Sequence, residues 1–180
     1  LCILAIKLTS RGKVFFGHQR IGFNGQTFGC LKFRSMYEDA AERLVTILAT
    51  DPAAKAEWEA NQKLARDPRV TPVGAFLRRT SLDELPQLLN VLRGDMSLVG
   101  NRPLPQYEAS LLTVDEWSTR FMAPAGITGL WQVTKRGHSH MSVEDRINLD
   151  IVYAQSHTDV WADLRIMRRT FGAFIQHENV

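Results

Sequence analysis

Residues 80–100 read TSLDELPQLLNVLRGDMSLVG, and they place two adjacent carboxylates, Asp83 and Glu84, in a stretch that is otherwise largely apolar. The leucine spacing predicts a helix that begins near Ser81 and ends at Gly94, because glycine commonly follows the last residue of a helix. Charged side chains are rarely buried without a partner. The acid pair therefore needs an explanation, either as a helix cap or as a chemical site.

Helix capping accounts for the pair without any catalytic role. Ser81 followed by Glu84 three residues later has the form of a capping box. Pro86 then falls in the first turns, where a missing N–H costs least. Acids in a first turn also face the positive end of the helix dipole, which stabilises the helix by ~0.3–1 kcal/mol each.

Arginines on both sides of the pair favour the chemical interpretation. They are Arg66, Arg69, Arg78, Arg79, Arg93 and Arg102. Arginine binds phosphate bidentately, so several guanidiniums near two carboxylates are typical of phosphoryl-transfer sites. A carboxylate can attack a phosphoryl centre and form a covalent intermediate, with a divalent cation to offset the charge. The residues alone leave capping and catalysis equally open.

The N-terminal part of the chain predicts a β-hairpin. Residues 14–21 and 27–33 are rich in aromatic and β-branched side chains. Asn24 and Gly25 lie between them, and both tolerate the positive φ that a tight hairpin turn requires.

Helical periodicity covers most of the remaining chain, apart from a proline-rich loop at 67–74. Helices are predicted at 35–63 with a break at Asp51-Pro52, at 74–93 with an interruption near Thr80-Ser81, at 142–156 and at 159–175. No repeat or linker is visible. The expected fold is a mainly helical α+β single domain over residues 1–180.

Composition narrows the class of protein. The chain has 180 residues, of which 44% are hydrophobic, enough for one compact domain with a core. Cys2 and Cys30 are far apart and form no CxxC motif, which excludes a disulfide framework and a cysteine zinc site. We expect both to be ordinary apolar residues.

Basic residues are concentrated at the N-terminal end. Residues 1–37 carry six basic side chains and no acidic one, in a chain whose net charge is +3. Such a segment favours an anionic neighbour, either phosphate, nucleic acid or an acidic lipid surface. The alternatives are a merely solvated basic face and a non-enzymatic module that binds membrane or nucleic acid.

Apolar segments at the two ends leave further alternatives. The run LCILAI at 1–6 is either a buried strand or the end of a longer hydrophobic segment, since a bilayer span needs ~20 residues. The last predicted helix carries an apolar stripe that packs on the core or lies in a membrane interface. The stripe consists of Trp161, Leu164, Met167, Phe171 and Phe174.

Isolated histidine and tryptophan residues carry weaker signals. His18, His138 and His140 lack the spacing of a metal site, and we expect them in solvated loops. Trp131 either stacks on a base or sugar or is buried beside Gly129.

Three longer motifs carry a specific resemblance. The runs KFRSM, DPRVTPVGAFLRRTSLDELPQLLNVLRGDMSLVGNRP and PAGITGLWQV, in this order, resemble the bacterial sugar transferase family. Its members are monotopic polyprenyl-phosphate phosphoglycosyl transferases that start the assembly of surface glycans. The resemblance covers about residues 7–174.

The resemblance implies a two-step reaction. A UDP-sugar donates its sugar-1-phosphate to undecaprenyl phosphate and releases UMP, through a covalent aspartyl-phosphosugar intermediate. It implies that Asp83 is the nucleophile and Glu84 its partner, and that both hold Mg²⁺. The implied phosphate- or substrate-binding residues are Arg78, Arg102, Lys32, Arg34 and Arg136. Asn101 stands where the family usually has Pro, next to Arg102, and TKRGH around Arg136 also departs from the family pattern.

The resemblance also implies an attachment to the membrane. Residues 1–8 would be the returning end of a re-entrant membrane helix, and the basic end and the last helix would face lipid headgroups. The expected location is the cytoplasmic face of a bacterial inner membrane. The expected partners are the UDP-sugar, undecaprenyl phosphate and the lipid surface, with no nucleic acid. The sugar, whether a hexose or an N-acetyl sugar, and a homo-oligomer are left open.

Overall fold

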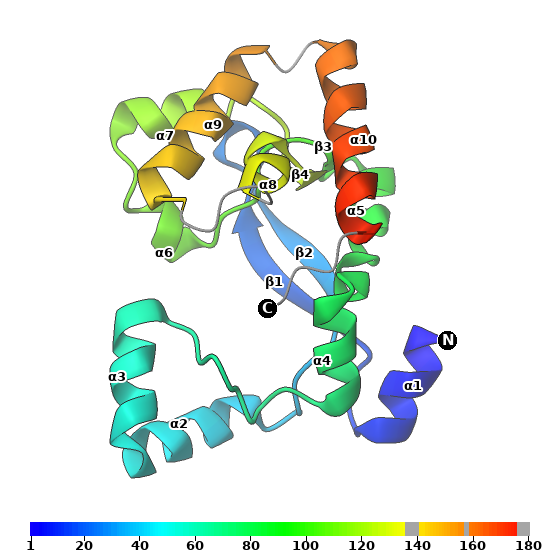
Figure 1. Ribbon diagram of the computed structural model, residues 1–180, viewed down its shortest axis with the longest axis vertical. Helices are drawn as coiled ribbons and strands as arrows, with labels where there is room; N and C mark the ends of the chain where they lie inside the picture. Colours follow the sequence, from blue (N-terminus) through cyan, green and yellow to red (C-terminus); the bar gives the residue numbers. More distant parts are fainter. Residues whose placement is uncertain (136–140, 157–158, 176–180) are drawn as a thin grey trace. The chain divides into compact units, whose positions relative to one another are not determined.

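The computed structural model describes residues 1–135, 141–156 and 159–175 (Figure 1). It is a mixed helical and sheet structure in which more than half of the residues are helical. The predicted class, mainly helical with an N-terminal β-hairpin, is therefore confirmed.

The contacts divide the chain into two compact units. The first unit comprises Leu1–Phe16 and Lys32–Leu85, and the second comprises Gly17–Leu31 and Pro86–Val180. The two strands of the hairpin run from one unit into the other. The predicted single domain over residues 1–180 stays a prediction.

The hairpin has the predicted form. Strands β1 (Phe15–Ile21) and β2 (Thr27–Phe33) make a two-stranded sheet joined by the 3-10 turn η1 (Phe23–Gly25). Asn24 has φ 52° and Gly25 has φ 72°, so both turn residues adopt the left-handed conformation that the Asn-Gly signal indicated.

The first unit is built mainly from helices. They are α1 (Cys2–Thr9), α2 (Ala40–Thr50), α3 (Pro52–Asn61), α4 (Pro72–Arg79) and the 3-10 turn η2 (Leu82–Glu84). The buried core consists of Ile6, Val14 and Leu77, with Phe33 and Val73 packed against it. The N-terminal apolar run forms the helix α1 and not the buried strand that was one of its two alternatives.

The break at Asp51 has a clear physical cause. The Asp51 carboxylate accepts hydrogen bonds from the N–H groups of Ala53 at 2.9 Å and Ala54 at 3.0 Å. Pro52 then occupies the first helical position, where its missing N–H is harmless. The predicted break is confirmed, although α2 starts at Ala40 and not at residue 35.

The predicted loop at 67–74 extends too far. Thr71 caps α4, because its hydroxyl oxygen accepts the N–H of Gly74 at 2.8 Å. Pro72 is therefore the first residue of a helix and not part of the loop.

The second unit contains a parallel strand pair that was not predicted. Strands β3 (Ser97–Val99) and β4 (Gly126–Thr128) pair in parallel, with Val99 opposite Thr128. The two backbones approach so closely at Gly100 and Gly126 that a Cβ on either glycine would clash with backbone atoms. Three-residue strands carry too little periodicity to be found from sequence.

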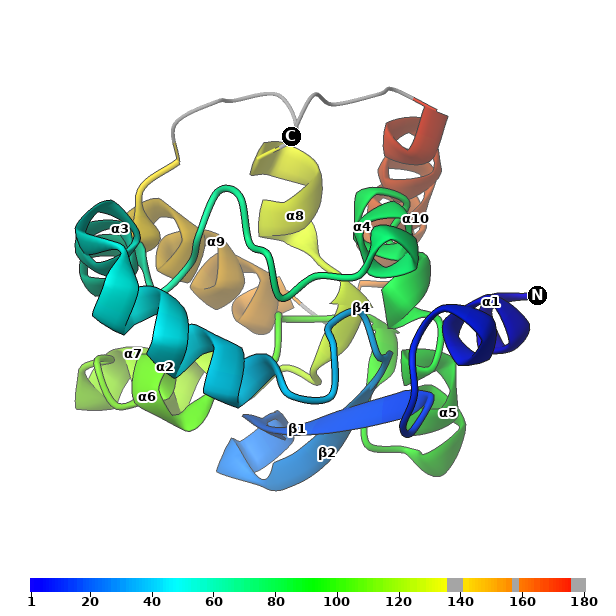
Figure 2. The same cartoon turned by 90° about the horizontal axis from the view of Figure 1, so that it is seen from below.

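Helices surround this pair. The elements are α5 (Gln87–Arg93), α6 (Gln106–Ala109), α7 (Val114–Arg120), α8 (Leu130–Lys135), α9 (Val143–Ser156) and α10 (Val160–Ile175). Helix α8 lies between α9 and α10, and α10 also contacts both strands (Figure 2). The main core cluster consists of Val99, Ala123, Tyr153, Ala154 and Ile166.

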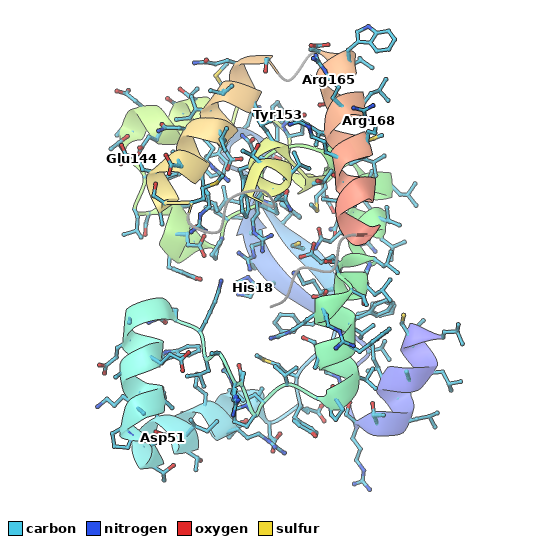
Figure 3. All side chains as sticks on the ribbon, in the orientation of Figure 1. His18, Asp51, Glu144, Tyr153, Arg165 and Arg168 are labelled. Atoms are coloured by element: carbon cyan, nitrogen blue, oxygen red, sulfur yellow. The ribbon has the colours of Figure 1, made fainter. Side chains whose placement is uncertain are left out.

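The two predicted C-terminal helices are confirmed, and α10 packs Met167 of the expected stripe on the core while the start of the stripe is exposed. Ile166 is buried, whereas Trp161 is 74% exposed and Leu164 is 47% exposed. Tyr153 on α9 donates its hydroxyl to Asp163 on α10 at 2.9 Å, while Arg165 lies on the exposed part of α10 (Figure 3). Core packing therefore does not explain the start of the stripe. The side chains of Phe171 and Phe174, like His138 and His140, lie outside the described part.

Within residues 1–135, 141–156 and 159–175, no helix combines the length and the apolar character needed to cross a membrane. Exposed apolar side chains are nevertheless present on α1, where Ile3, Leu4 and Leu8 are 51%, 60% and 76% exposed.

Candidate active site

The acid pair lies in a tight turn and not in the first turn of a long helix. Helix α4 ends at Arg79, and Ser81 then adopts the left-handed conformation with φ 55°. Asp83 and Glu84 follow within η2, and α5 begins only after Pro86. The Ser81 side chain makes no capping bond, so the expected capping box is wrong. The left-handed backbone of Ser81 interrupts the helix between α4 and α5.

Lys32 on β2 compensates part of the negative charge of the acid pair. Its Nζ lies 2.5 Å from Glu84 Oε1 and 3.8 Å from Asp83 Oδ2. The side chain of Asp83 is 11% exposed and that of Glu84 is 23% exposed. Two carboxylates and one ammonium thus share a partly buried site, with the cation nearer to Glu84.

The environment makes the Asp83 carboxyl harder to ionise. Burial raises its pKa above the ordinary value for aspartate, and the negative charge of Glu84 adds to this effect. The positive charges of Lys32 and Arg78 oppose it. An ionised Asp83 is therefore poorly solvated and held mainly by two nearby cations.

Arg78 is held beside the acid pair by Ser35. The guanidinium Nε of Arg78 donates to Ser35 Oγ at 2.8 Å. The N–H of Thr71 donates to the Ser35 carbonyl at 3.0 Å, and a Cβ on Gly74 would clash with that carbonyl. The start of α4 is thus fixed on Ser35, which fixes the direction in which Arg78 leaves the helix.

Other guanidiniums of the first unit have structural partners. Arg34 donates to the carbonyl oxygens of Ser10, at 3.0 Å, and Arg11. Arg69 makes two bonds to the Asp67 carboxylate, at 2.8 and 2.7 Å. The structure gives Arg34 a role in holding the segment after α1, and its phosphate-binding role stays a prediction.

Arg102 belongs to the second unit. Its guanidinium carbon lies 5.9 Å from the ring centre of Trp131, and that of Arg146 lies 5.8 Å from the same ring. Burial and the charge of Arg102 lower the pKa of Arg20. Trp131 is only 9% exposed, which favours the buried alternative over stacking on a ligand. Arg136 lies outside the described residues.

A buried polar network holds the segment that contains Arg102. Arg120, at the end of α7, uses one nitrogen, Nη2, to bind Asp150 Oδ2 at 2.5 Å and the Arg102 carbonyl at 2.8 Å. Asn101 donates its side-chain amide to the carbonyls of Arg120 at 2.8 Å and Asp150 at 2.9 Å. Burial raises the pKa of the Asp150 carboxyl to about 6, against the opposing charge of Arg120.

Sequence reasoning missed three of these features. It did not find Ser35 as the partner of Arg78, although Ser35 is part of the KFRSM motif. It assigned Lys32 to phosphate and not to the acid pair. It gave no role to Arg120 or Asp150, since an isolated Arg and an isolated Asp carry no pattern that identifies them as partners.

The acid pair has the donor set that Mg²⁺ uses. Mg²⁺ is usually bound by one or two carboxylates together with phosphate oxygens of a substrate. In the described part of the chain, His, Cys, Asp and Glu form no group of three that could hold a metal without a substrate. Asp83 and Glu84 therefore fit a metal that arrives with a phosphorylated ligand.

Several known bacterial proteins are similar to this chain. The chain is 44% identical over 178 residues to the UDP-galactose-lipid carrier transferase of Erwinia amylovora, covering 98% of this chain and 36% of that protein. It is 48% identical over 159 residues to the undecaprenyl-phosphate galactose phosphotransferase of Salmonella typhimurium, covering 88% and 33%. It is 45% identical over 174 residues to the exopolysaccharide production protein ExoY of Rhizobium meliloti, covering 96% and 75%.

The chain thus spans about a third of the length of the first two relatives and three quarters of ExoY. The names of the first two relatives describe them as transferases, one of them as a galactose phosphotransferase. The model of the family described as bacterial sugar transferase matches residues 1–177. The predicted resemblance is therefore confirmed, and the chain belongs to the bacterial sugar transferase family.

Proposed function

We propose that the protein containing this chain transfers hexose-1-phosphate from a UDP-hexose to undecaprenyl phosphate and releases UMP. Family membership supports the reaction class. Relatives named as undecaprenyl-phosphate galactose and glucose phosphotransferases support a hexose donor and this lipid acceptor. The product would start the assembly of a surface polysaccharide.

The observation that carries this proposal is the buried Asp83 in a turn that also contains Glu84, with Lys32 of β2 paired to both carboxylates. In the first step, an oxygen of the Asp83 carboxylate bonds to the sugar-proximal phosphorus of the donor. The bond from that phosphorus to the bridging oxygen breaks, and UMP leaves with the electron pair. In the second step, a phosphate oxygen of undecaprenyl phosphate attacks the same phosphorus and releases the Asp83 carboxylate.

The contacts of Lys32 favour Asp83 over Glu84 as the nucleophile. Lys32 is 2.5 Å from Glu84 and 3.8 Å from Asp83, so the closer ion pair occupies Glu84. Asp83 is also the more buried of the two, and a poorly solvated carboxylate is a more reactive one. Glu84 then serves to hold Lys32 beside the nucleophile.

Arginine side chains would bind the donor phosphates. Arg78 fits this role in the first unit, because Ser35 orients it and its charge acts on Asp83. We assign the same task to Arg102 in the second unit, and to Arg136 by its position after the TGLWQV motif. Lys32 and Arg34 remain weaker candidates, since both have protein partners.

Asp83 and Glu84 would hold Mg²⁺ together with the donor phosphates, where the ion would offset the charge between an anionic nucleophile and an anionic donor.

We also propose that the protein acts at the cytoplasmic face of a bacterial inner membrane. The exposed apolar residues of α1 and the exposed Trp161 of α10 support contact with lipid. Exposed Arg165, Arg168 and Arg169 on α10 would add attraction to anionic headgroups.

Radiolabelled donor tests the proposal directly. The full-length protein in membranes is incubated with UDP-glucose or UDP-galactose carrying label in the sugar-proximal phosphate, first without and then with undecaprenyl phosphate. We expect UMP release with labelled protein in the first case, and transfer of the label to lipid in the second. Label that never appears on protein in the wild type, while lipid product forms, would show a direct transfer and reject the covalent step.

A further inference from the structure

The Arg120–Asp150 ion pair is the most completely buried charge pair in the described part of the chain. The two side chains are 2% and 3% exposed, and their closest atoms are 2.5 Å apart. The pair joins the end of α7 to α9. Through the same Nη2 atom, Arg120 also holds the carbonyl of Arg102.

Stability does not account for this pair. A buried ion pair is often no more stabilising than apolar residues of the same volume, because two charges lose their hydration. Three polar atoms of the network, Asn101 Oδ1, Arg120 Nη1 and Asp150 Oδ1, are buried without a hydrogen-bond partner among the described residues. A partly satisfied network in a low-dielectric interior is costly. We therefore expect a functional role of the network that offsets the free-energy cost of burying these polar atoms.

The bonds of the network converge on two consecutive residues. Asn101 ties its own side chain to α7 through the Arg120 carbonyl and to α9 through the Asp150 carbonyl. The next residue, Arg102, is held by its carbonyl. The Asn101 backbone is fixed as well, because its N–H donates to Pro124 and its carbonyl accepts from Gly126. The backbone from which the Arg102 side chain departs is therefore immobilised on several sides.

The guanidinium of Arg102 is not used by this network. Its carbon lies 5.9 Å from the Trp131 ring centre. Its positive charge acts to lower the pKa of both Arg20 and Asp150. It is a half-buried cation whose backbone is fixed and whose charge opposes that of Arg20. Such an arrangement suits the binding of an anionic group, which would relieve the repulsion between Arg102 and Arg20.

We propose that Arg120 and Asp150 are positioning residues, which fix the backbone at Asn101 and Arg102 and thereby direct the Arg102 guanidinium toward an anionic group of the sugar donor. The inference rests on the proposed function, specifically on Arg102 as a donor-binding residue. A proline at position 101 could not make the two amide bonds, so the side chain of Asn101 is part of the same device.

A double-mutant cycle tests this inference in the full-length protein. The pair is replaced by apolar residues of similar size, Arg120→Met with Asp150→Leu, in the wild type and in Arg102→Ala. The readout is kcat/KM for UMP release from UDP-glucose or UDP-galactose, whichever the wild type uses, together with the melting temperature.

We expect the apolar pair to melt at or above the wild-type temperature and to lose at least about tenfold in kcat/KM, the effect of one charge-assisted hydrogen bond. Arg102→Ala should lose a similar factor, and the triple variant should lose no more than Arg102→Ala alone. Full activity of the apolar pair, or losses that multiply in the triple variant, would overturn the inference.

Two further variants keep the outcome clear. If the apolar pair does not fold, Arg120→Lys takes its place, because the lysine Nζ ends about one bond short of Nη2 and can keep a charge opposite Asp150 without the bond to the Arg102 carbonyl. The exposed pair Arg43–Asp39, at 2.8 Å, is the matched control, and Arg43→Met with Asp39→Leu should leave kcat/KM unchanged.

The same measurements distinguish failure of the proposed function from failure of the positioning role. No UMP release by the wild type would reject the function and the inference together. Normal kcat/KM in Arg102→Ala, with UMP release by the wild type intact, would reject only the positioning role.

Discussion

Asp83 in the first unit and Asp150 in the second are both buried beside a cation, and the distances to the cation differ. Asp83 lies 3.8 Å from Lys32, which is closer to Glu84 at 2.5 Å. Asp150 lies 2.5 Å from Arg120 in a pair that is almost fully buried. Burial raises the pKa of both carboxyls.

On the proposed function, the difference separates a carboxylate that reacts, Asp83, from one that only holds the structure, Asp150. A nucleophile needs an oxygen that is not committed to a close ion pair, and Asp83 has this because Glu84 binds the lysine more closely. A carboxylate in a network needs a close cationic partner, which Arg120 Nη2 provides for Asp150 Oδ2. The two sites thus use one residue type for two purposes, set by the distance to the cation.

The largest expected effect is on turnover, and it comes from Asp83→Asn. An amide is a poor nucleophile, so UMP release should fall by several orders of magnitude while circular dichroism and the melting temperature stay near the wild-type values. Asp39→Asn, at an exposed site, is the control and should keep full activity. Substantial UMP release by purified Asp83→Asn would remove Asp83 from the role of nucleophile.

The same chemical change at Asp150 should act on stability. Asp150→Asn leaves the Arg120 guanidinium buried without a counter-charge, and such a loss typically costs ~3–5 kcal/mol in the free energy of unfolding. Asp83→Asn should cost far less, since Lys32 keeps Glu84 as its partner. Chemical denaturation of the two variants side by side measures the contrast. Equal destabilisation by both changes would contradict it.

Local sequence signals predicted the elements that depend on local physics. The hairpin followed from Asn24-Gly25, whose backbone takes the expected left-handed conformation. The break at Asp51-Pro52 followed from a capping carboxylate beside a proline. The acid pair itself stood out, because two charges in an apolar stretch are visible in any sequence.

Features that depend on distant residues could not be predicted. The parallel pairing of β3 with β4 joins two three-residue segments, and no periodicity marks either of them. The capping box at Ser81 failed because Ser81 adopts a left-handed backbone conformation and its side chain makes no capping bond. Asp150 meets Arg120 across thirty residues, so neither residue signals the other in the sequence.

A smaller effect should come from Arg78 and the residue that orients it. Arg78→Ala removes one charge-assisted phosphate contact, worth ~1.5–3 kcal/mol, so kcat/KM for UMP release should fall by roughly 10- to 150-fold. Ser35→Ala removes only the orienting bond of 2.8 Å and should cost ~0.5–1.5 kcal/mol. Arg43→Ala is the exposed control. A larger loss in Ser35→Ala than in Arg78→Ala would mean that Ser35 acts on the site by another route.

The smallest expected effect is a shift in pH dependence, and it tests why the two aspartates differ. Asp83 must be ionised to react, and burial raises its pKa, so kcat/KM should decline as the pH falls through that raised pKa. Lys32 opposes the rise, and Lys32→Met removes its charge. The decline should then begin at a higher pH.

Rates of UMP release from about pH 4 to about pH 9 measure this shift. Lys55→Met, which removes the cation of the exposed Lys55–Glu59 pair, is the matched control and should leave the profile unchanged. The result is the pH at which kcat/KM declines on the acid side of the profile (the acid limb), and not the maximum of kcat/KM. Loss of a phosphate contact by Lys32 would lower the rate at every pH and leave that position unchanged. An acid limb that stays in place in Lys32→Met would show that the ammonium acts only on Glu84, and that the 3.8 Å separation already isolates Asp83 from it.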